Sequence, residues 1–224
     1  MKKHFFVVIE GIDNSGKTTL LKLIKKQLEE PENSLIRNYF GEKIYFTSEP
    51  YGPNQEIKYF RLSDLIFSQD CIFSSESETY LFLAMRADHL SSFIVPKLQE
   101  NSLIFCDRYF LSTLAYQSYL KKVDTNWLVS NMKHISKGIK PLVTFVLEVS
   151  KENHLSYKTK KNGKSHNEYD SVNSFSYEDL VTAYDWAVKY LRDTGEEVVW
   201  IPSSLSWEEK AQTVISYIKK GLDE

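Results

Sequence analysis

Cysteine and histidine are scarce in this 224-residue chain, and neither is spaced as metal ligands or as a disulfide framework. Cys71 and Cys106 are the two cysteines. Cys106 ends an apolar run, so we expect it to be a small buried core residue rather than a reactive thiol. The five histidines form no H-E-x-x-H or related pattern. The sequence therefore predicts no metal cage built from protein side chains.

Long apolar runs and a strong net charge are also missing. No segment approaches the length of a membrane span. The apolar run that follows Lys2 and Lys3 stops at Glu10, so it is too short to be the core of a secretory signal. A formal net charge of −2 argues against a basic surface for nucleic acid. We therefore expect a cytoplasmic protein whose partners are small molecules, not nucleic acid or membranes.

The chain does contain short apolar runs that alternate with amphipathic segments. Strands are predicted at residues 5–9, 43–47, 102–106, 142–149 and 197–201. Helices are predicted from Lys17 onward and at residues 55–68, 74–100, 109–121, 124–137, 176–194 and 206–221, with Pro96 bending or ending the third of these. This alternation predicts a single α/β domain over residues 1–224, a three-layer sandwich around a five-stranded parallel sheet.

Residues 11–18 match the pattern G-x-x-x-x-G-K-[ST] between the first strand and the first helix. The glycines let successive backbone N–H groups converge on phosphate oxygens, and the helix N-terminus favours an anion. Lys17 can reach the β- and γ-phosphates, and the Thr18 hydroxyl can hold Mg²⁺. A chance glycine turn is the alternative, but the strand–loop–helix context favours a P-loop NTPase fold. The predicted ATP-binding residues are Gly11, Ile12, Asp13, Asn14, Ser15, Gly16, Lys17, Thr18 and Thr19.

Other polar motifs also follow strands, namely residues 48–50, residues 107–109 and Glu148. The carboxyl ends of parallel strands meet at one edge, so these motifs should converge in one crevice. Asp107 has the placement of a Mg²⁺-holding carboxylate opposite Thr18. It could also cap the following helix. Arg108 can hold a phosphate with two hydrogen bonds, unless it is an ordinary surface arginine.

Three segments together resemble the thymidylate kinase family, which uses Mg-ATP to phosphorylate deoxythymidine monophosphate (dTMP) to dTDP. They are residues 6–19, residues 81–86 with Pro96 beyond them, and residues 106–117. The last segment, Cys-Asp-Arg-Tyr-Phe-Leu-Ser-Thr-Leu-Ala-Tyr-Gln, is far more specific than the P-loop. The resemblance extends over nearly the whole chain and implies ATP as donor, Mg²⁺ as cofactor, a role in deoxynucleotide and dTTP biosynthesis, and a homodimer.

The resemblance also implies roles for individual residues. Asp13 matches the carboxylate that binds the acceptor 3′-hydroxyl, Phe82 the ring that stacks on thymine, and Arg86 the side chain that contacts its O4. Spacing of i and i+4 places the last two on one helix face, although Phe82 in the core and Arg86 in solvent is the alternative. The predicted acceptor-binding residues are Asp13, Glu49, Phe82, Arg86, Arg108, Ser112, Tyr116 and Gln117. Tyr116 would exclude a ribose 2′-hydroxyl, unless it is an ordinary buried tyrosine, and the predicted catalytic residues are Lys17, Asp107 and Arg108.

Two departures from the family pattern affect charge at the site. The P-loop has Asn14 and Ser15 and thus no basic residue before Lys17, while the expected mobile lid at about residues 157–174 contains no arginine. Its candidate cations are Lys158, Lys160, Lys161 and Lys164, any of which could also be simply solvated. Ser48 stands where the family usually has arginine, and Lys58 or Arg61 could fill that gap.

Two other functions compete with this interpretation. A deoxynucleoside kinase shares the P-loop and an Asp-Arg pair, but it needs a carboxylate base to activate a neutral 5′-hydroxyl. A P-loop GTPase switch predicts an Asn-Lys-x-Asp segment, which the chain lacks. A monophosphate kinase of broader acceptor range is a third possibility, because Ser48 weakens the argument for strict dTMP preference.

Overall fold

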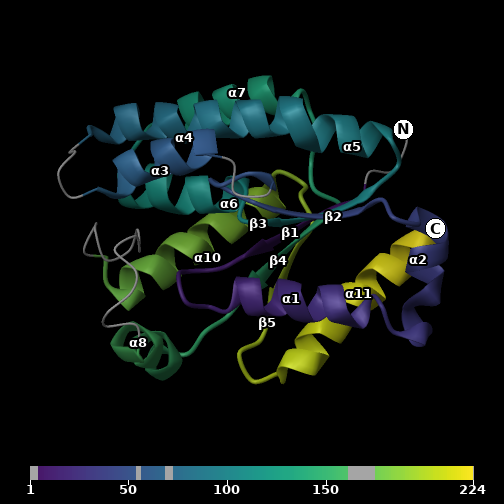
Figure 1. The fold of residues 1–224 in the computed structure, drawn as a ribbon. Helices are drawn as coiled ribbons and strands as arrows, with labels where there is room; N and C mark the ends of the chain where they lie inside the picture. The colour runs from purple at the N-terminus through teal and green to yellow at the C-terminus, as the bar shows by residue number, and fades with distance from the viewer. Residues whose placement is uncertain (1–4, 54–56, 69–72, 161–174, 224) are drawn as a thin grey trace.

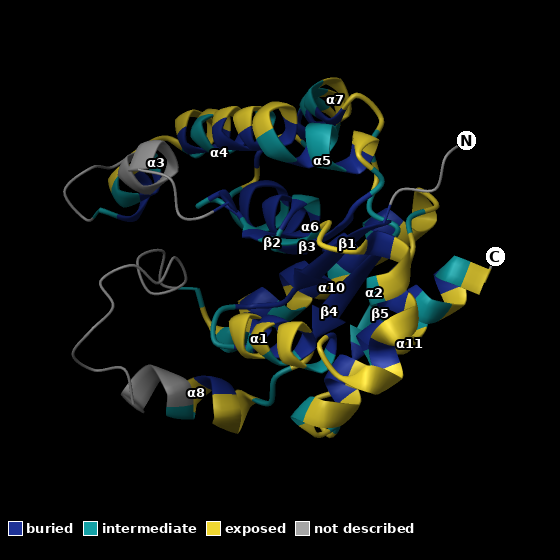
Figure 2. Ribbon diagram, turned by 45° about the vertical axis from the view of Figure 1, so that its right-hand side comes forward, coloured by how far each residue is buried: buried dark blue, intermediate teal, exposed yellow. Residues whose placement is uncertain are grey.

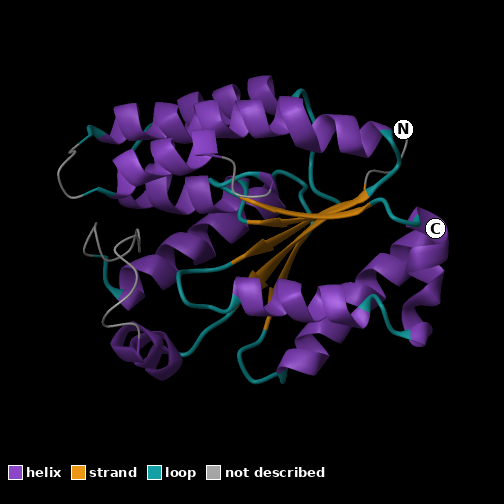
Figure 3. Cartoon of the chain, viewed as in Figure 1, coloured by secondary structure: helices purple, strands orange, loops and turns teal. Residues whose placement is uncertain are grey.

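A five-stranded parallel sheet forms the centre of the computed structural model, with strands in the order β2-β3-β1-β4-β5 (Figures 1 and 3). The structure describes all residues except 1–4, 54–56, 69–72, 161–174 and 224. At residues 57–61 and 157–160 it describes the backbone but not the side chains. The strands are β1 (Phe5–Glu10), β2 (Ile44–Ser48), β3 (Leu103–Asp107), β4 (Val143–Leu147) and β5 (Val198–Ile201). The predicted fold class and strand positions are confirmed.

Helices cover both faces of the sheet, because strand side chains alternate between the faces. On β1, Phe6 and Val8 join the core cluster beneath one helical layer, whereas Phe5, Val7 and Ile9 join the cluster on the other side. Figure 2 shows the buried strands between the two layers, with exposed residues on the outer helix surfaces. The first layer includes α3 (Ile57–Phe67), α4 (Ser75–His89), α6 (Phe110–Thr113), α7 (Thr125–Ser136) and α10 (Tyr177–Asp193), and the second α1 (Lys17–Gln27), α2 (Ser34–Phe40) and α11 (Trp207–Asp223).

Two helices contain π-helical segments that the sequence did not predict. The predicted helix at 74–100 consists of α4, a π-helical segment at Leu90–Ile94, and α5 (Val95–Gln99) with Pro96 in its first turn. Helix α6 likewise continues into a π-helical segment at Leu114–Leu120, where Tyr116 and Gln117 are buried. Such segments change the direction in which side chains point and occur often at functional sites.

Two further differences concern segments that the sequence treated as irregular. Helix α2 follows a 3₁₀ turn at Pro31–Asn33, in a region where the sequence predicted neither a helix nor a strand. Helix α8 (Lys151–Lys160) extends into the start of the expected lid, and residues 161–174 lie outside the described part of the chain. None of the described helices is both long and apolar enough to span a membrane.

Candidate active site

The loop between β1 and α1 has the backbone geometry of a phosphate cradle. Gly11 has φ +142° and Gly16 has φ +90°, conformations that favour glycine, and Gly16 is the N-cap of α1. The Lys17 ammonium donates to the carbonyl oxygens of Gly11 and Ile12, at 2.9 and 3.0 Å. Burial lowers the pKa of Lys17. This cation is thus held at the mouth of the loop, beside the helix N-terminus that favours anions.

Two polar side-chain atoms of the same loop are buried without a protein partner. They are the amide nitrogen of Asn14 and the hydroxyl of Ser15, neither of which has a hydrogen bond to any described residue. Buried donors of this kind are costly unless they find an acceptor. Phosphate oxygens would supply acceptors at this place.

Thr18 and Asp107 bring a hydroxyl and a carboxylate together beside the loop. The Thr18 Oγ1 donates to Asp107 Oδ2 at 3.2 Å, although the residues are 89 positions apart. The other carboxylate oxygen, Asp107 Oδ1, is buried and has no partner among the described residues. Hard oxygen ligands are what Mg²⁺ prefers, so this pair fits the ion that the sequence predicted here.

Arg108 follows Asp107 and turns toward the P-loop. Its backbone has φ +68°, and its N–H donates to the Ile9 carbonyl at 2.9 Å. The guanidinium forms an ion pair with Asp13 through Nη2, and its Nη1 donates to Ser112 Oγ at 2.8 Å. Asp13 and Arg108, predicted to bind different parts of the acceptor, therefore contact each other directly.

Glu10 is a buried carboxylate that the sequence analysis did not identify as part of the site. It accepts hydrogen bonds from the backbone N–H groups of Tyr109 and Ser112, at 2.7 and 3.1 Å, and from Ser112 Oγ at 2.6 Å. Burial raises its pKa, although Arg108 and these hydrogen bonds oppose the rise. Glu10 thus binds the N-terminal end of α6, the capping role that the sequence left open for Asp107.

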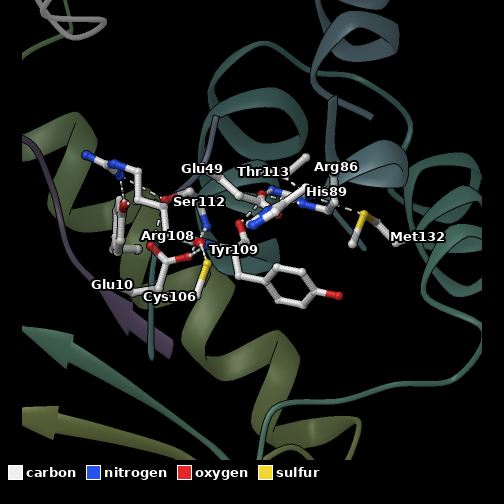
Figure 4. A network of polar contacts seen from close by, with 11 residues as sticks. Glu10, Glu49, Arg86, His89, Cys106, Arg108, Tyr109, Ser112, Thr113 and Met132 are labelled. Atoms are coloured by element: carbon white, nitrogen blue, oxygen red, sulfur yellow. Dashed lines mark hydrogen bonds and ion pairs between the residues drawn. The ribbon is translucent and has the colours of Figure 1, made fainter. Parts of the chain in front are cut away.

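Arg86 and Glu49 form a buried ion pair in the site (Figure 4). Arg86 Nε donates to Glu49 Oε2 at 2.6 Å, and His89 Nδ1 lies 3.4 Å from the other carboxylate oxygen. Burial alone would raise the pKa of Glu49, but the charge of Arg86 and the contact with His89 lower it below its usual value. Arg86 also donates to Thr113 Oγ1, the Tyr109 carbonyl and Met132 Sδ. The alternative of a solvated Arg86 is therefore wrong.

A cavity of about 140 Å³ lies between these groups, and every residue predicted to bind the acceptor lines it. Its wall includes both the Phe82 ring and the Arg86–Glu49 pair. The sequence did not identify Tyr51, Phe67 or His89, which also line it. The predicted residues in its lining are Asp13, Glu49, Phe82, Arg86, Arg108, Ser112, Tyr116 and Gln117. Their roles toward a bound nucleotide stay predictions.

The predicted cations of the lid and of the Ser48 gap are not placed at the site. Lys161 and Lys164 lie outside the described residues, and Lys158 and Lys160 are in α8, but their side chains are not described. The same holds for the side chains of Lys58 and Arg61 on α3. Cys106 is buried as predicted, whereas Cys71 lies outside the described residues.

A phosphate cradle, a hydroxyl–carboxylate pair and an adjoining pocket at the carboxyl edge of a parallel sheet define a P-loop kinase. A family model described as thymidylate kinase matches residues 9–214. A thymidylate kinase from Mycoplasmopsis pulmonis is 30% identical over 223 residues, which cover 96% of this chain and 88% of the relative. The chain belongs to the thymidylate kinase family.

A further relative and a solved structure are also similar to this chain. A probable thymidylate kinase from Pyrococcus horikoshii is 38% identical over 129 residues, which cover 57% of this chain and 58% of that relative. The crystal structure of thymidylate kinase from Ehrlichia chaffeensis shares the fold, with a TM-score of 0.68 over 96% of this chain and 98% of that one, at 21% identity. Family membership supports dTMP phosphorylation and ATP as donor, and it does not favour the deoxynucleoside kinase alternative.

Proposed function

We propose that this chain transfers the terminal phosphoryl group of Mg-ATP to the 5′-phosphate of dTMP, giving dTDP for dTTP biosynthesis. The observation that carries this proposal is the acceptor cavity, whose lining joins the Phe82 ring and Arg86 to Asp13 of the P-loop. A base at the Phe82 end would thus place its phosphate toward Arg108 and the P-loop.

The reaction proposed is a direct in-line transfer without a covalent enzyme intermediate. The acceptor phosphate is already largely ionised at neutral pH, so the reaction needs no strong general base. Lys17 and the loop amides bind the donor phosphates, and Arg108 holds the acceptor phosphate. The rate enhancement then comes from positioning and from charge stabilisation in a site that closes against water.

Mg²⁺ is proposed as the cofactor, held by Thr18 and Asp107. The support is the buried, unpartnered Oδ1 of Asp107 beside the Thr18 hydroxyl. When bound, the ion neutralises charge on the β- and γ-phosphates. Thr18 and Asp107 come from α1 and β3, so their contact fixes the distance between these two elements.

The base is proposed to stack on Phe82 and to be read by Arg86. An arginine has five N–H donors, and those of Arg86 point to Glu49, Thr113, the Tyr109 carbonyl and Met132. The Met132 Sδ, at 3.2 Å, is the weakest of these acceptors. We therefore propose that the hydrogen of Arg86 Nη1 that now points to Met132 Sδ is the one that turns to the thymine O4.

The charge that compensates for Asn14 in the P-loop is proposed to come from the lid lysines, Lys158, Lys160, Lys161 and Lys164. Single replacements by methionine would identify the lysine responsible, because only replacement of the one that contacts the migrating phosphoryl group should lower kcat strongly.

The gap left by Ser48 makes a broader deoxynucleotide range the second candidate function.

A homodimer and a cytoplasmic location complete the proposal. Large apolar side chains are exposed on α3 and α4, at Leu65 and Tyr80, which are candidates for an interface. Size-exclusion chromatography with light scattering should give a mass near twice 26.2 kDa. A mass of one chain at micromolar concentration would contradict the dimer, and cell fractionation tests the location.

The proposed function is tested by offering thymidine and dTMP separately, with Mg-ATP, and identifying the products. We expect dTDP from dTMP and no dTMP from thymidine. Phosphorylation of thymidine alone would show a deoxynucleoside kinase instead.

A further inference from the structure

Tyr184 is a fully buried tyrosine on α10 whose hydroxyl lies inside the active site. Its side chain is 1% exposed. The hydroxyl lies 3.0 Å from the Gly11 carbonyl oxygen, 2.8 Å from Arg108 Nη1 and 3.0 Å from Ser112 Oγ. It therefore contacts both the P-loop and the arginine proposed to hold the acceptor phosphate.

The hydrogens in this cluster can be assigned without conflict. Nη1 of Arg108 has two, which point to Ser112 Oγ and to Tyr184 Oη. The Ser112 hydroxyl donates to Glu10 Oε2 at 2.6 Å, which leaves the single Tyr184 hydrogen for the Gly11 carbonyl. Burial raises the pKa of Tyr184, so the hydroxyl keeps this hydrogen.

The same assignment shows what remains of the Arg108 guanidinium. Nη1 is fully used by Ser112 and Tyr184, and one hydrogen of Nη2 points to Asp13. The Nε hydrogen and the second Nη2 hydrogen have no acceptor among the described residues. Both hydrogens are thus available to donate to the oxygens of an acceptor phosphate.

We propose that Tyr184 is a positioning residue for the transfer, which holds Arg108 through its hydroxyl and ties that arginine to the first carbonyl of the P-loop. This inference rests on the proposed function. The donor loop follows β1, and Arg108 follows β3. The Tyr184 hydroxyl on α10 fixes the one relative to the other. Arg108 is charged and long, so without this acceptor its guanidinium would sample more orientations.

Replacing Tyr184 by phenylalanine isolates the hydroxyl. The ring packs edge-on against Tyr116, at a centroid distance of 6.1 Å, and phenylalanine retains that packing. The Gly11 carbonyl stays hydrogen-bonded, because Lys17 also donates to it. The variant therefore removes one acceptor from Arg108 and creates no buried unpaired group on the P-loop.

The experiment compares wild type and Tyr184→Phe in steady-state kinetics with dTMP and ATP, with Tyr190→Phe on the same helix as control. We expect Tyr184→Phe to lower kcat/KM for dTMP by about tenfold, with the KM for ATP and the unfolding midpoint nearly unchanged. Tyr190→Phe should match wild type. Unchanged kcat/KM in Tyr184→Phe overturns the inference, and so does an equal loss for both substrates with a lower midpoint.

A double-mutant cycle with Arg108→Lys tests whether Tyr184 acts through Arg108. Lysine lacks the fork that Tyr184 holds, so Tyr184→Phe should cost little more in that background. Fully additive losses would contradict the inference. A wild type that is inactive on dTMP refutes the proposed function as well, whereas an active wild type with an unaffected Tyr184→Phe variant refutes the inference alone.

Discussion

The indole ring of Trp207 lies directly against Gly16 of the P-loop. A Cβ on Gly16 would sit 2.2 Å from Cη2 of this ring, far inside contact distance. Trp207 begins α11 and Gly16 caps α1, so these two helices meet at the phosphate cradle. The sequence motif explains a glycine here by its backbone conformation, and the structure adds a steric reason.

Replacing Gly16 by alanine should therefore do more than strain the backbone. An L-residue in the left-handed region costs about 1–2 kcal/mol, and the added overlap must displace Trp207 or the loop. Gly195→Ala is a matched control, because Gly195 has φ +78° and nothing within 4 Å of an added Cβ. We expect a loss of about 1 kcal/mol for Gly195→Ala. Urea unfolding should show a larger loss for Gly16→Ala, and its KM for ATP should rise at least tenfold; equal effects would contradict the steric account.

Lys17→Ala should abolish most turnover while the fold survives. Lys17 is the buried cation at the mouth of the cradle, and charge on the transferred group must be stabilised in the transition state. We expect kcat to fall by a factor on the order of a thousand, with a far-UV spectrum like that of wild type. Lys22→Ala, an exposed lysine on the same helix, is the control. Near-normal turnover in Lys17→Ala would remove the P-loop from the mechanism.

Apolar patterning was enough to predict the sheet. The strands are short, largely apolar runs, and β1 has every side chain buried. The same patterning could not predict helix α2, nor the π-helical turns that aim Tyr116 and Gln117. The π-helical turns depend on backbone hydrogen bonds that shift by one residue, which composition does not encode.

Arg86→Ala should affect both stability and acceptor binding. Truncation leaves the buried Glu49 carboxylate with only the 3.4 Å contact to His89 among the described residues, and breaking a buried ion pair typically costs about 3–5 kcal/mol. We expect a correspondingly lower free energy of unfolding and a higher KM for dTMP, with ATP binding little changed. Phe82→Leu, which removes the proposed stacking ring without touching the ion pair, is the comparison. It should raise the KM for dTMP at nearly wild-type stability. If Arg86→Ala left dTMP binding unchanged, the base-reading role would be wrong.

The Glu49–Arg86 pair also predicts a dependence of stability on pH. The folded state lowers the pKa of Glu49 below its ordinary value of 4.5, so folding favours the ionised form. Its contribution is present above that value and is lost as the pH falls through the folded pKa. Glu10 has a raised pKa and acts in the opposite direction, so wild type alone is not diagnostic.

Comparison with Glu49→Gln isolates the effect of Glu49. Urea unfolding at a series of pH values should show a constant advantage of wild type above about pH 6, because the shifted group is then fully ionised. The advantage should shrink as the pH falls below 4.5. An advantage that stays constant into the acidic range would mean that the ion pair does not set this dependence.

The site was partly predictable for a different reason from the sheet. Polar motifs after strands converge at one edge, so Asp13, Asp107 and Arg108 were expected together. The pairing of Glu49 with Arg86, 37 residues apart, requires the tertiary structure. Glu10 and Tyr184 were missed because neither belongs to a recognised motif: Glu10 ends a buried strand, and Tyr184 lies on the apolar face of a helix. A charged residue at the end of a buried strand was the one available signal.

The most direct test of the account is a coupled assay of ADP formation with wild-type protein, ATP and Mg²⁺ across a panel of nucleoside monophosphates. We predict the highest kcat/KM for dTMP, lower values for other deoxynucleotides, and the lowest for ribonucleotides, which Tyr116 should exclude. The same panel with Lys17→Ala should be nearly silent. Turnover of a ribonucleotide in preference to dTMP, or no turnover of any monophosphate, would contradict the account.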